Sequence, residues 1–233
     1  MKEVSITIPI YNEEGSIGNT VKNLVRVFKK NKVDYQLVLV SHGSKDNSDD
    51  IIKKLGRKNR RIKPLILKKN REYGGGIMYG FEHSDGKCIG WTCADEEVSA
   101  EDTYKIYAEL KKNKIDVVKA LRKNRKDGFF RIITTKIFNG IISIRFNLKI
   151  KDVNGYPLFM SLKKYRTLNI KETGPLFNLD LLREIKSRGY SVSELEVEHI
   201  KRIAGKSSLN LMKVIKMALR LINYSIKSLI NIS

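Results

Sequence analysis

The segment Cys88-Ile89-Gly90-Trp91-Thr92-Cys93-Ala94-Asp95-Glu96-Glu97 passes from apolar residues into three consecutive carboxylates. Its apolar part predicts a buried strand, and the carboxylates follow where that strand would end. Ligands of open α/β sheets bind beyond the carboxyl ends of the strands, so acidic residues here indicate an oxygen-ligated cation with bound phosphates. Acidic residues are also typical of the first turn of a helix. Both interpretations stay open on this segment alone.

Predicted strands and helices alternate on the N-terminal side of this segment. The strands cover residues 4–9, 35–40 and 62–67, and the helices cover residues 17–30, 51–55 and 78–81, the last after a run of glycines. Such alternation over about ninety residues is typical of a parallel, doubly wound α/β sheet. Right-handed crossovers place the loops after the strands on one edge, so residues 11–13, 41–44 and 95–97 are expected to meet in one crevice.

The rest of the chain is predicted to add helices at 102–110, 132–146 and 179–188 and strands at 117–120 and 191–197. After Gly205, basic residues recur at steps of three and four among apolar ones, which predicts a basic amphipathic helix. This helix either packs on its own domain or lies in a membrane interface. We therefore divide the chain into a main domain, residues 1–208, and a C-terminal helix, residues 209–233.

Composition favours a folded globular protein. The 233 residues are 41% apolar and 30% charged, which leaves room for one sizeable α/β domain. Cys88 and Cys93 would point to opposite faces of one strand, so no disulfide is expected and a reducing, cytoplasmic compartment is favoured. The first residues show no signal-peptide pattern, and no apolar run approaches the roughly 20 residues of a spanning helix. The sequence thus predicts a soluble protein or one peripheral to a membrane.

The formal net charge of +21 permits three classes of partner: nucleic acid, an anionic membrane surface or a polyanionic small substrate. Residues 111–151 hold thirteen Lys or Arg against only Asp116 and Asp127, so one localised basic patch is expected. Nucleic acid is not favoured, because the basic stretches contain no recognised module and few aromatic residues on which bases would stack.

Several segments, in this order, resemble landmarks of the inverting family 2 glycosyltransferases with a GT-A fold. They are residues 8–14, 40–48, 73–80 with 88–97, 120–122, 127–131, 152–155 and 202–207. The likeness runs from Val4 to about Leu209 and is greatest to dolichol-phosphate mannose synthases and bacterial polyprenyl-phosphate relatives. Residues 8–14 are similar to the opening nucleotide-binding strand and loop of that family, and residues 88–97 to the strand that leads into its Asp-x-Asp motif.

The resemblance implies a mostly parallel open sheet flanked by helices and an inverting transfer at the membrane surface. A hexose would move from a nucleotide sugar, of the GDP-mannose or UDP-glucose type, to a polyprenyl or dolichyl phosphate. Mg²⁺ or Mn²⁺ is the implied cofactor. The positive charge after Leu110 and the basic amphipathic C-terminal helix favour an anionic membrane surface as a partner. The second pKa of a phosphate monoester lies near 6, so this acceptor is already a nucleophile at neutral pH and needs no strong general base.

The resemblance also assigns site residues. Implied to bind the nucleotide are Pro9, Tyr11, Asn12, Glu13, Ser41, His42, Ala94 and Asp95. Asp95 and Glu97 are the implied metal ligands, and the acceptor phosphate falls to Arg122, Arg131, Arg202 and Lys206, since arginine grips phosphate best. Asp95, Arg122 and Arg131 are the implied catalytic residues.

Two departures from the family pattern keep alternatives open. Ser41-His42 replaces an acidic pair that contacts the base, and Cys93 replaces the first aspartate of Asp-x-Asp. A thiol is a poor ligand for Mg²⁺ or Mn²⁺. The site then binds its cation with fewer direct ligands, takes an unusual donor, or belongs to a degenerate transferase kept as a binding subunit. A further variant has a glycan hydroxyl as acceptor, with Asp180 as its catalytic base.

Overall fold

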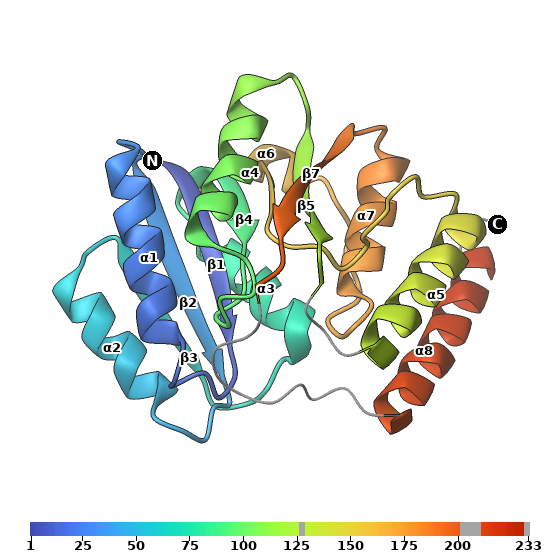
Figure 1. The fold of residues 1–233 in the computed structure, drawn as a ribbon, viewed down its shortest axis with the longest axis horizontal. Helices are drawn as coiled ribbons and strands as arrows, with labels where there is room; N and C mark the ends of the chain where they lie inside the picture. Colours follow the sequence, from blue (N-terminus) through green and yellow to red (C-terminus); the bar gives the residue numbers. More distant parts are fainter. Residues whose placement is uncertain (126–128, 201–210, 231–233) are drawn as a thin grey trace.

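The computed structural model describes residues 1–125, 129–200 and 211–230. A seven-stranded sheet forms the centre of the molecule, with strand order β3-β2-β1-β4-β6-β5-β7 (Figure 1). The strands are β1 (Lys2–Ile10), β2 (Tyr35–His42), β3 (Ile62–Leu67), β4 (Gly86–Trp91), β5 (Val117–Lys123), β6 (Leu158–Ser161) and β7 (Val192–Glu198). Side chains from both faces of the sheet join one continuous apolar core.

Helices cover the sheet and extend it to one side. They are α1 (Ile17–Lys30), α2 (Ser48–Lys58), α3 (Glu72–Glu82), α4 (Ala100–Lys112), α5 (Phe129–Phe146), α6 (Leu162–Tyr165), α7 (Phe177–Ser187) and α8 (Leu211–Ile230). Helix α1 packs against α2 and α4, whereas α3 packs against β1, β2 and α7. Helices α5 and α8 lie side by side at the edge of the molecule farthest from α2 (Figure 1).

The predicted α/β sheet is confirmed, with one strand that was not predicted. β1 pairs in parallel with β2 and β4, β2 with β3, and β5 with β7. Strand β6 lies between β4 and β5 and runs antiparallel to both, so the sheet is mixed. The parallel strands bring their carboxyl ends to one edge, as the right-handed crossovers required.

The expectation that the glycine run precedes a helix is wrong. Helix α3 begins at Glu72, so Gly74, Gly75 and Gly76 lie inside it. A Cβ at Gly74 would stand 2.4 Å from a side-chain carbon of Phe177, and one at Gly80 would stand 2.3 Å from Thr7. Close packing of this helix on the sheet and on α7 therefore requires glycine, although glycine is a poor helix former.

The predicted C-terminal helix is present as α8. Leu221 and Tyr224 are buried, and the ring of Tyr224 lies 5.9 Å from that of Phe146 at the end of α5. Arg220 binds Glu72 and Glu172, which ties the same helix to the body of the protein. Among the described residues, none of the helices combines the length and apolar character that crossing a bilayer requires. Both cysteines are free.

Candidate active site

A cavity of about 580 Å³ opens where β1, β2, β4 and β5 end, which is the size range of small-molecule sites. Its lining comes from the ends of these strands and the loops after them, from the segments that precede α3, β6 and α7, and from α3, α5, α7 and α8. The lining residues are Pro9, Tyr11, Glu13, His42, Asn70, Glu72, Tyr73, Cys93, Ala94, Asp95, Glu97, Arg122, Arg125, Thr134, Thr135, Phe138, Asn154, Tyr156, Pro175, Asn178 and Met217. The predicted crevice therefore exists, and segments from the whole length of the chain build it.

The loop after β4 turns two of its three carboxylates into this cavity. Asp95 and Glu97 line it and are only 4% and 3% exposed, and the amide of Glu97 donates to Oδ1 of Asp95 at 3.3 Å. Glu96 has a positive φ of 57° and points the other way, where its carboxylate accepts a hydrogen bond from Asn23 of α1. The helical interpretation of these acids is wrong, because α4 begins only at Ala100.

Two side chains from distant segments hold the Glu97 carboxylate. The hydroxyl of Tyr156 donates to Oε2 of Glu97 at 2.8 Å, and Nε2 of His199 lies 3.3 Å from the same oxygen. His199 follows β7, and the next residue, Ile200, donates its amide to the carbonyl of Glu97. A buried carboxylate needs such partners, since an uncompensated one would cost several kcal/mol.

The donor set fits a hard divalent cation with few protein ligands. Within the described part of the chain, no group of three or more His, Cys, Asp or Glu side chains is arranged to hold a metal ion. Mg²⁺ commonly takes one or two carboxylates and completes its shell with water and substrate phosphates, so Asp95 and Glu97 suffice for that mode. Burial, and then the charges of Asp95 and Glu97, raise the pKa of the Cys93 thiol. Cys93 is therefore a neutral thiol at pH 7, and a thiol is a poor ligand for Mg²⁺ or Mn²⁺.

Arg122, at the end of β5, is held by a buried ion pair. Its Nε donates to Oδ2 of Asp152 at 2.8 Å and its Nη2 donates to Oδ1 at 3.1 Å. The guanidinium lies 5.1 Å from the centre of the Tyr156 ring. Burial would raise the pKa of Asp152, but the hydrogen bonds and charge of Arg122, together with Lys119, lower it below its ordinary value. Arg122 thus reaches the cavity in a fixed orientation, with two donors already engaged.

The other residues predicted at the acceptor site do not line the cavity among the described residues. The side chain of Arg131 and all of Arg202 and Lys206 lie outside the described residues. Asp180 does not line the cavity. Its Oδ2 accepts the amides of Lys171 and Glu172, and its Oδ1 accepts the hydroxyl of Tyr224.

The predicted nucleotide-binding residues divide between the cavity and its surroundings. Pro9, Tyr11, Glu13 and His42 line the cavity. The ring of Tyr11 is half-exposed, with its centre 6.2 Å from that of His42, and Nδ1 of His42 lies 3.2 Å from Oδ1 of Asn70. Burial lowers the pKa of His42. This imidazole is therefore neutral at pH 7.

Two predicted nucleotide-binding side chains point elsewhere. Asn12 accepts the amide of Lys45 in the neighbouring loop, and Ser41 donates to Asp49 of α2 at 2.5 Å. Successive residues of a strand face opposite sides of the sheet, so only one of Ser41 and His42 can face the cavity. Here that residue is His42.

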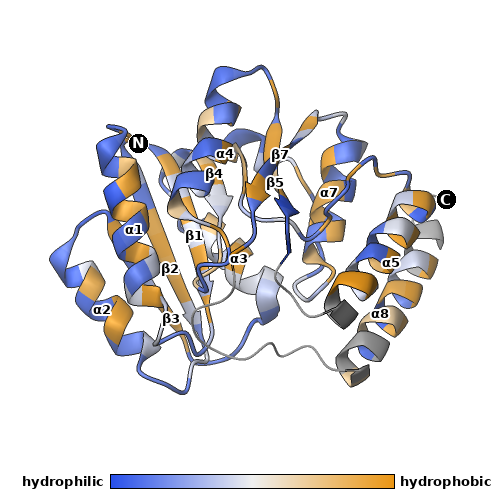
Figure 2. Cartoon of the chain, viewed as in Figure 1, coloured by the Kyte–Doolittle hydropathy of each residue, from blue (hydrophilic) through white to orange (hydrophobic). Residues whose placement is uncertain are grey.

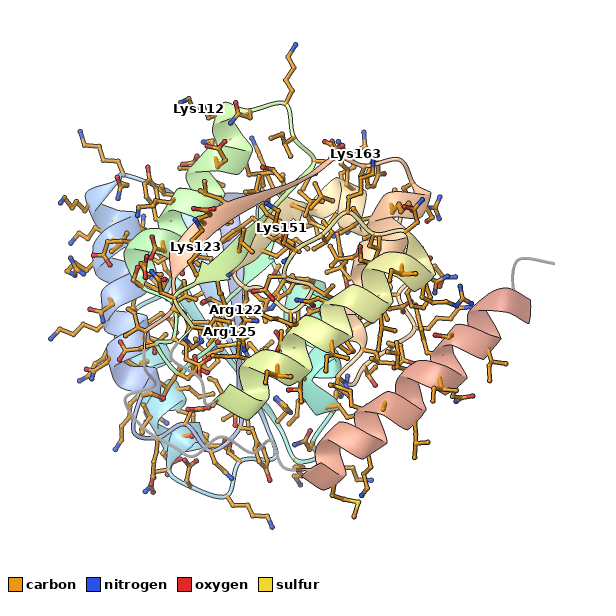
Figure 3. All side chains as sticks on the ribbon, turned by 45° about the vertical axis from the view of Figure 1, so that its right-hand side comes forward. Lys112, Arg122, Lys123, Arg125, Lys151 and Lys163 are labelled. Atoms are coloured by element: carbon orange, nitrogen blue, oxygen red, sulfur yellow. The ribbon has the colours of Figure 1, made fainter. Side chains whose placement is uncertain are left out.

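Several lining residues were not predicted. Arg125 lies beside Arg122 at the end of β5 and near the start of α5 (Figure 3). Partly buried Tyr73 and buried Tyr156 are aromatic walls of the cavity, and α5 contributes Thr134, Thr135 and Phe138. For Arg125 the signal is the basic stretch 111–151, which predicts a patch but does not single out a residue. For the two tyrosines and the residues of α5, no local sequence pattern distinguishes a residue that lines a cavity from one that packs in the core.

Comparison with known proteins gives one family and one fold. A profile of glycosyl transferase family 2 matches residues 5–171. The chain is 28% identical over 217 residues to the undecaprenyl-phosphate 4-deoxy-4-formamido-L-arabinose transferase of Edwardsiella ictaluri (strain 93-146), a match that covers 92% of this chain and 65% of that protein. It is 27% identical over 220 residues to the protein of the same name from Proteus mirabilis (strain HI4320), with coverage of 93% and 66%. The chain thus spans slightly less than two thirds of the length of these curated relatives.

Solved structures share the fold at low sequence identity. Glucosyl-3-phosphoglycerate synthase from Mycobacterium tuberculosis in complex with UDP superposes with a TM-score of 0.72 at 13% identity, covering 97% of this chain and 79% of that one. The same synthase with Mn²⁺, UDP and phosphoglyceric acid gives 0.68 at 13% identity, with coverage of 88% and 72%. At this identity the likeness is one of fold.

Proposed function

Because this chain belongs to glycosyl transferase family 2, we propose that it transfers a sugar from a nucleotide sugar to a polyprenyl phosphate, with inversion and with the help of a divalent cation. Family membership confirms the resemblance found in the sequence. We place the reaction at the cytoplasmic surface of a membrane, where a lipid phosphate is accessible, and the free Cys88 and Cys93 suit that reducing compartment. The names of the curated relatives support the lipid phosphate as acceptor class.

The observation that carries this proposal is the pair of buried carboxylates, Asp95 and Glu97, in a cavity that also presents arginine. Anionic side chains alone would repel a nucleotide sugar. A cation between them and the diphosphate reverses that repulsion, and Mn²⁺ or Mg²⁺ accompanies UDP in solved structures of the same fold. When bound by Asp95 and Glu97, the cation would offset the charge that the departing diphosphate gathers.

The donor end of the cavity suits a nucleoside. Tyr11 offers an exposed ring on which a base can stack, and neutral His42 offers a ring nitrogen for hydrogen bonding to base or ribose. Pro9 and Glu13 complete this end. The nucleoside would lie over the ends of β1 and β2, which directs its diphosphate towards the loop after β4.

The acceptor end suits a phosphate monoester. Arg122 and Arg125 bring positive charge to the cavity, and Asp152 fixes the orientation of Arg122. Arg131, Arg202 and Lys206 remain proposed contributors. They belong to residues 127–131 and 202–207, two of the segments that resemble the family. An oxygen of the acceptor phosphate, already ionised, attacks the anomeric carbon while the bond from that carbon to the diphosphate oxygen breaks. Because the acceptor phosphate is already ionised, no residue has to remove a proton from it.

The identity of the sugar is left open. A hexose is the expectation from the dolichol-phosphate mannose synthases. The curated relatives are named for a derivative of arabinose, which is a five-carbon sugar. We therefore propose a nucleoside diphosphate sugar of either size as donor. The glycan-hydroxyl alternative is not favoured, because Asp180, its candidate base, lies away from the cavity with both carboxylate oxygens occupied by Lys171, Glu172 and Tyr224.

The test is transfer of radiolabel from UDP- and GDP-sugars to undecaprenyl phosphate in detergent with Mn²⁺. The expected product is soluble in chloroform. Asp95→Asn should lower the rate about a hundredfold, which is typical for loss of a group that stabilises developing charge. Glu96→Gln is the matched control, because Glu96 belongs to the same loop but points towards Asn23, and it should stay within about twofold of the wild type. Equal rates for Asp95→Asn and the wild type would refute the proposal.

A further inference from the structure

Lys119 lies buried in the middle of β5 and has no part in the reaction proposed above. Its side chain is 1% exposed, and lysine is rarely buried to this degree unless it is paired. Figure 2 shows the strands of the sheet mainly in hydrophobic colours, with hydrophilic ones towards the end of β5. Glu194 of β7 is the register partner of Lys119, and its Oε1 lies 3.7 Å from Nζ of Lys119. Apolar residues of similar size would often stabilise a fold as well as such a pair does, so stability alone does not account for it.

The two side chains hold the backbone on either side of the Asp152 α-carbon. Oε2 of Glu194 accepts the amide of Lys151 at 2.7 Å, and its Oε1 accepts the amide of Asp152 at 2.9 Å. Nζ of Lys119 donates to the carbonyl of Asp152, which also accepts the amide of Gly155 at 2.9 Å and so closes a turn. A Cβ at Gly155 would stand 2.9 Å from Nζ of Lys119, so this turn packs directly on the buried amine.

Asp152 in turn fixes Arg122. Its Oδ2 accepts Nε of Arg122 and its Oδ1 accepts Nη2, at 2.8 and 3.1 Å. The amide, the carbonyl and both carboxylate oxygens of Asp152 are therefore all engaged. Asp152 cannot rotate or shift without breaking hydrogen bonds in a buried place, which is costly. The position of the Arg122 guanidinium is thus set, through Asp152, by Lys119 and Glu194.

The same segment also reaches the proposed cation ligands. Three residues separate Asp152 from Tyr156, whose hydroxyl donates to Oε2 of Glu97 at 2.8 Å. Residues 152–156 therefore connect Arg122, which we assign to the acceptor phosphate, with Glu97, which we assign to the cation of the diphosphate. Attack of one phosphate at a carbon that leaves another requires accurate placement, and an error of about 1 Å can cost about a hundredfold in rate.

We propose that Lys119 and Glu194 are positioning residues, which hold residues 151–152 so that Arg122 stands at the spacing from Glu97 that the attack requires. Neither of these two described residues lines the cavity, so both act through Asp152. The inference rests on the proposed function, because that function assigns Arg122 to the acceptor phosphate. The alternative is a purely structural pair, whose loss would weaken the whole fold and would not act selectively on the acceptor.

The first experiment measures transfer to undecaprenyl phosphate by Lys119→Met, whose side chain has a similar length but no N–H. The kcat/KM for this acceptor should fall about tenfold, because Arg122 is no longer held in place. Mn²⁺-dependent binding of UDP, measured by calorimetry, should stay within about twofold of the wild type, because no residue of the donor end has changed.

A double-mutant cycle then tests the route through Asp152. In a variant that already carries Arg122→Met and Asp152→Leu, adding Lys119→Met should not lower kcat/KM further, because the groups that Lys119 positions are gone. Lys164→Met is the matched control. Lys164 forms an ion pair with Asp116 away from the cavity, so its loss should leave kcat/KM within about twofold of the wild type.

The Nε–H of Arg122 gives a second measurement that needs no turnover. Its exchange with solvent, followed by NMR, should be slow in the wild type, because Asp152 accepts this hydrogen in a buried place. Lys119→Met should speed the exchange about tenfold by loosening Asp152. Glu194→Gln keeps the shape of the side chain and one acceptor oxygen, and it should change exchange and kcat/KM in the same directions by about threefold. It replaces Lys119→Met in every measurement should that variant not fold.

Three results would overturn the inference. One is an unchanged exchange rate of the Arg122 Nε–H. Another is a fall in UDP binding equal to the fall in kcat/KM, and the third is the same fall in kcat/KM with and without the Arg122–Asp152 pair; either would assign the pair a purely structural role. Failure of the proposed function is distinguishable, because it would appear as no transfer from any donor, while the exchange rate would still report whether Lys119 positions Arg122.

Discussion

Asp152→Asn should destabilise the protein by about 3–5 kcal/mol, because it leaves the charge of Arg122 buried without its partner. The two side chains are 3% and 6% exposed and are joined by hydrogen bonds of 2.8 and 3.1 Å. Water therefore screens this pair very little. The buried ammonium of Lys119, which donates to the backbone carbonyl of Asp152 and lies 3.7 Å from Glu194, adds further positive charge nearby.

Urea unfolding followed by circular dichroism measures this effect. With a slope of about 2–3 kcal/mol per molar, the midpoint should fall by about 1–2.5 M. Glu101→Gln is the matched control, because it breaks the exposed pair with Arg26, whose side chains are 57% and 53% exposed, and such pairs contribute only about 0–1 kcal/mol. Arg122→Met combined with Asp152→Leu should cost less than the sum of the single changes, because neither charge is left alone.

The pH dependence of the free energy of unfolding tests the Arg122–Asp152 pair a second time. The pKa of Asp152 in the folded protein lies below 3.8, its ordinary value, so the unfolded chain binds the proton more readily. The stabilisation is complete above about pH 4 and is lost as the pH falls through the folded pKa. Asp152→Asn should lack this loss. If Asp152→Asn moved the midpoint no more than Glu101→Gln does, the pair would not be compensating a buried charge and our reasoning would be wrong.

Three other changes test the site and the fold. Cys93→Asp should tighten Mn²⁺-dependent UDP binding about tenfold in calorimetry by adding a carboxylate ligand, whereas unchanged binding would place Cys93 outside the cation shell. His42→Asn should remove part of the loss of stability below about pH 6.5, because the pKa of His42 is lowered by burial and the unfolded chain takes up the proton first; identical pH profiles of the melting temperature would contradict this. Gly90→Ala should lower the free energy of unfolding by more than about 2 kcal/mol, since its Cβ would stand 2.2 Å from the ring of Phe159. Gly18→Ala, with open space around it, should instead stabilise α1 by up to about 1 kcal/mol. Thermal melts of both glycine variants check the last pair, and a harmless Gly90→Ala would refute it.

Local pattern was sufficient for elements with clear periodicity. The predicted bounds of α1 and β3 agree with the structure, because α1 has apolar residues at helical spacing and β3 is a short, mostly apolar segment. Strand β6 has only four residues and pairs with segments far away in the chain, so nothing local marks it. For α3, the low helix propensity of its glycines misled the prediction, since close packing on Phe177 and Thr7 outweighs propensity.

The site could be predicted as far as strand order brings loop ends together. Asp95, Glu97, His42 and Arg122 all line the cavity, because each follows or ends a strand at the same edge of the sheet. The partners that orient them could not be predicted. Tyr156 reaches Glu97 across a separation of 59 residues, and such a contact depends on tertiary packing. The face of the sheet towards which each strand residue points also depends on strand register, which the sequence does not specify. For this reason the prediction included Ser41, although only its neighbour His42 lines the cavity.

The buried carboxylates of the cavity bear on the alternative that this chain is a degenerate transferase kept as a binding subunit. With Cys93 in place of an aspartate, the loop after β4 holds two inward carboxylates, Asp95 and Glu97, where the family pattern has room for more. That number remains within what Mg²⁺ takes from protein when substrate phosphates supply the other oxygens, so the replacement does not by itself remove the cation. Two buried carboxylates are unfavourable for folding, and apolar residues of similar size would leave the protein as stable or more so. A transferase that must attract a cation and a diphosphate uses this pair, and the pair therefore favours an enzyme over a subunit that only binds a partner.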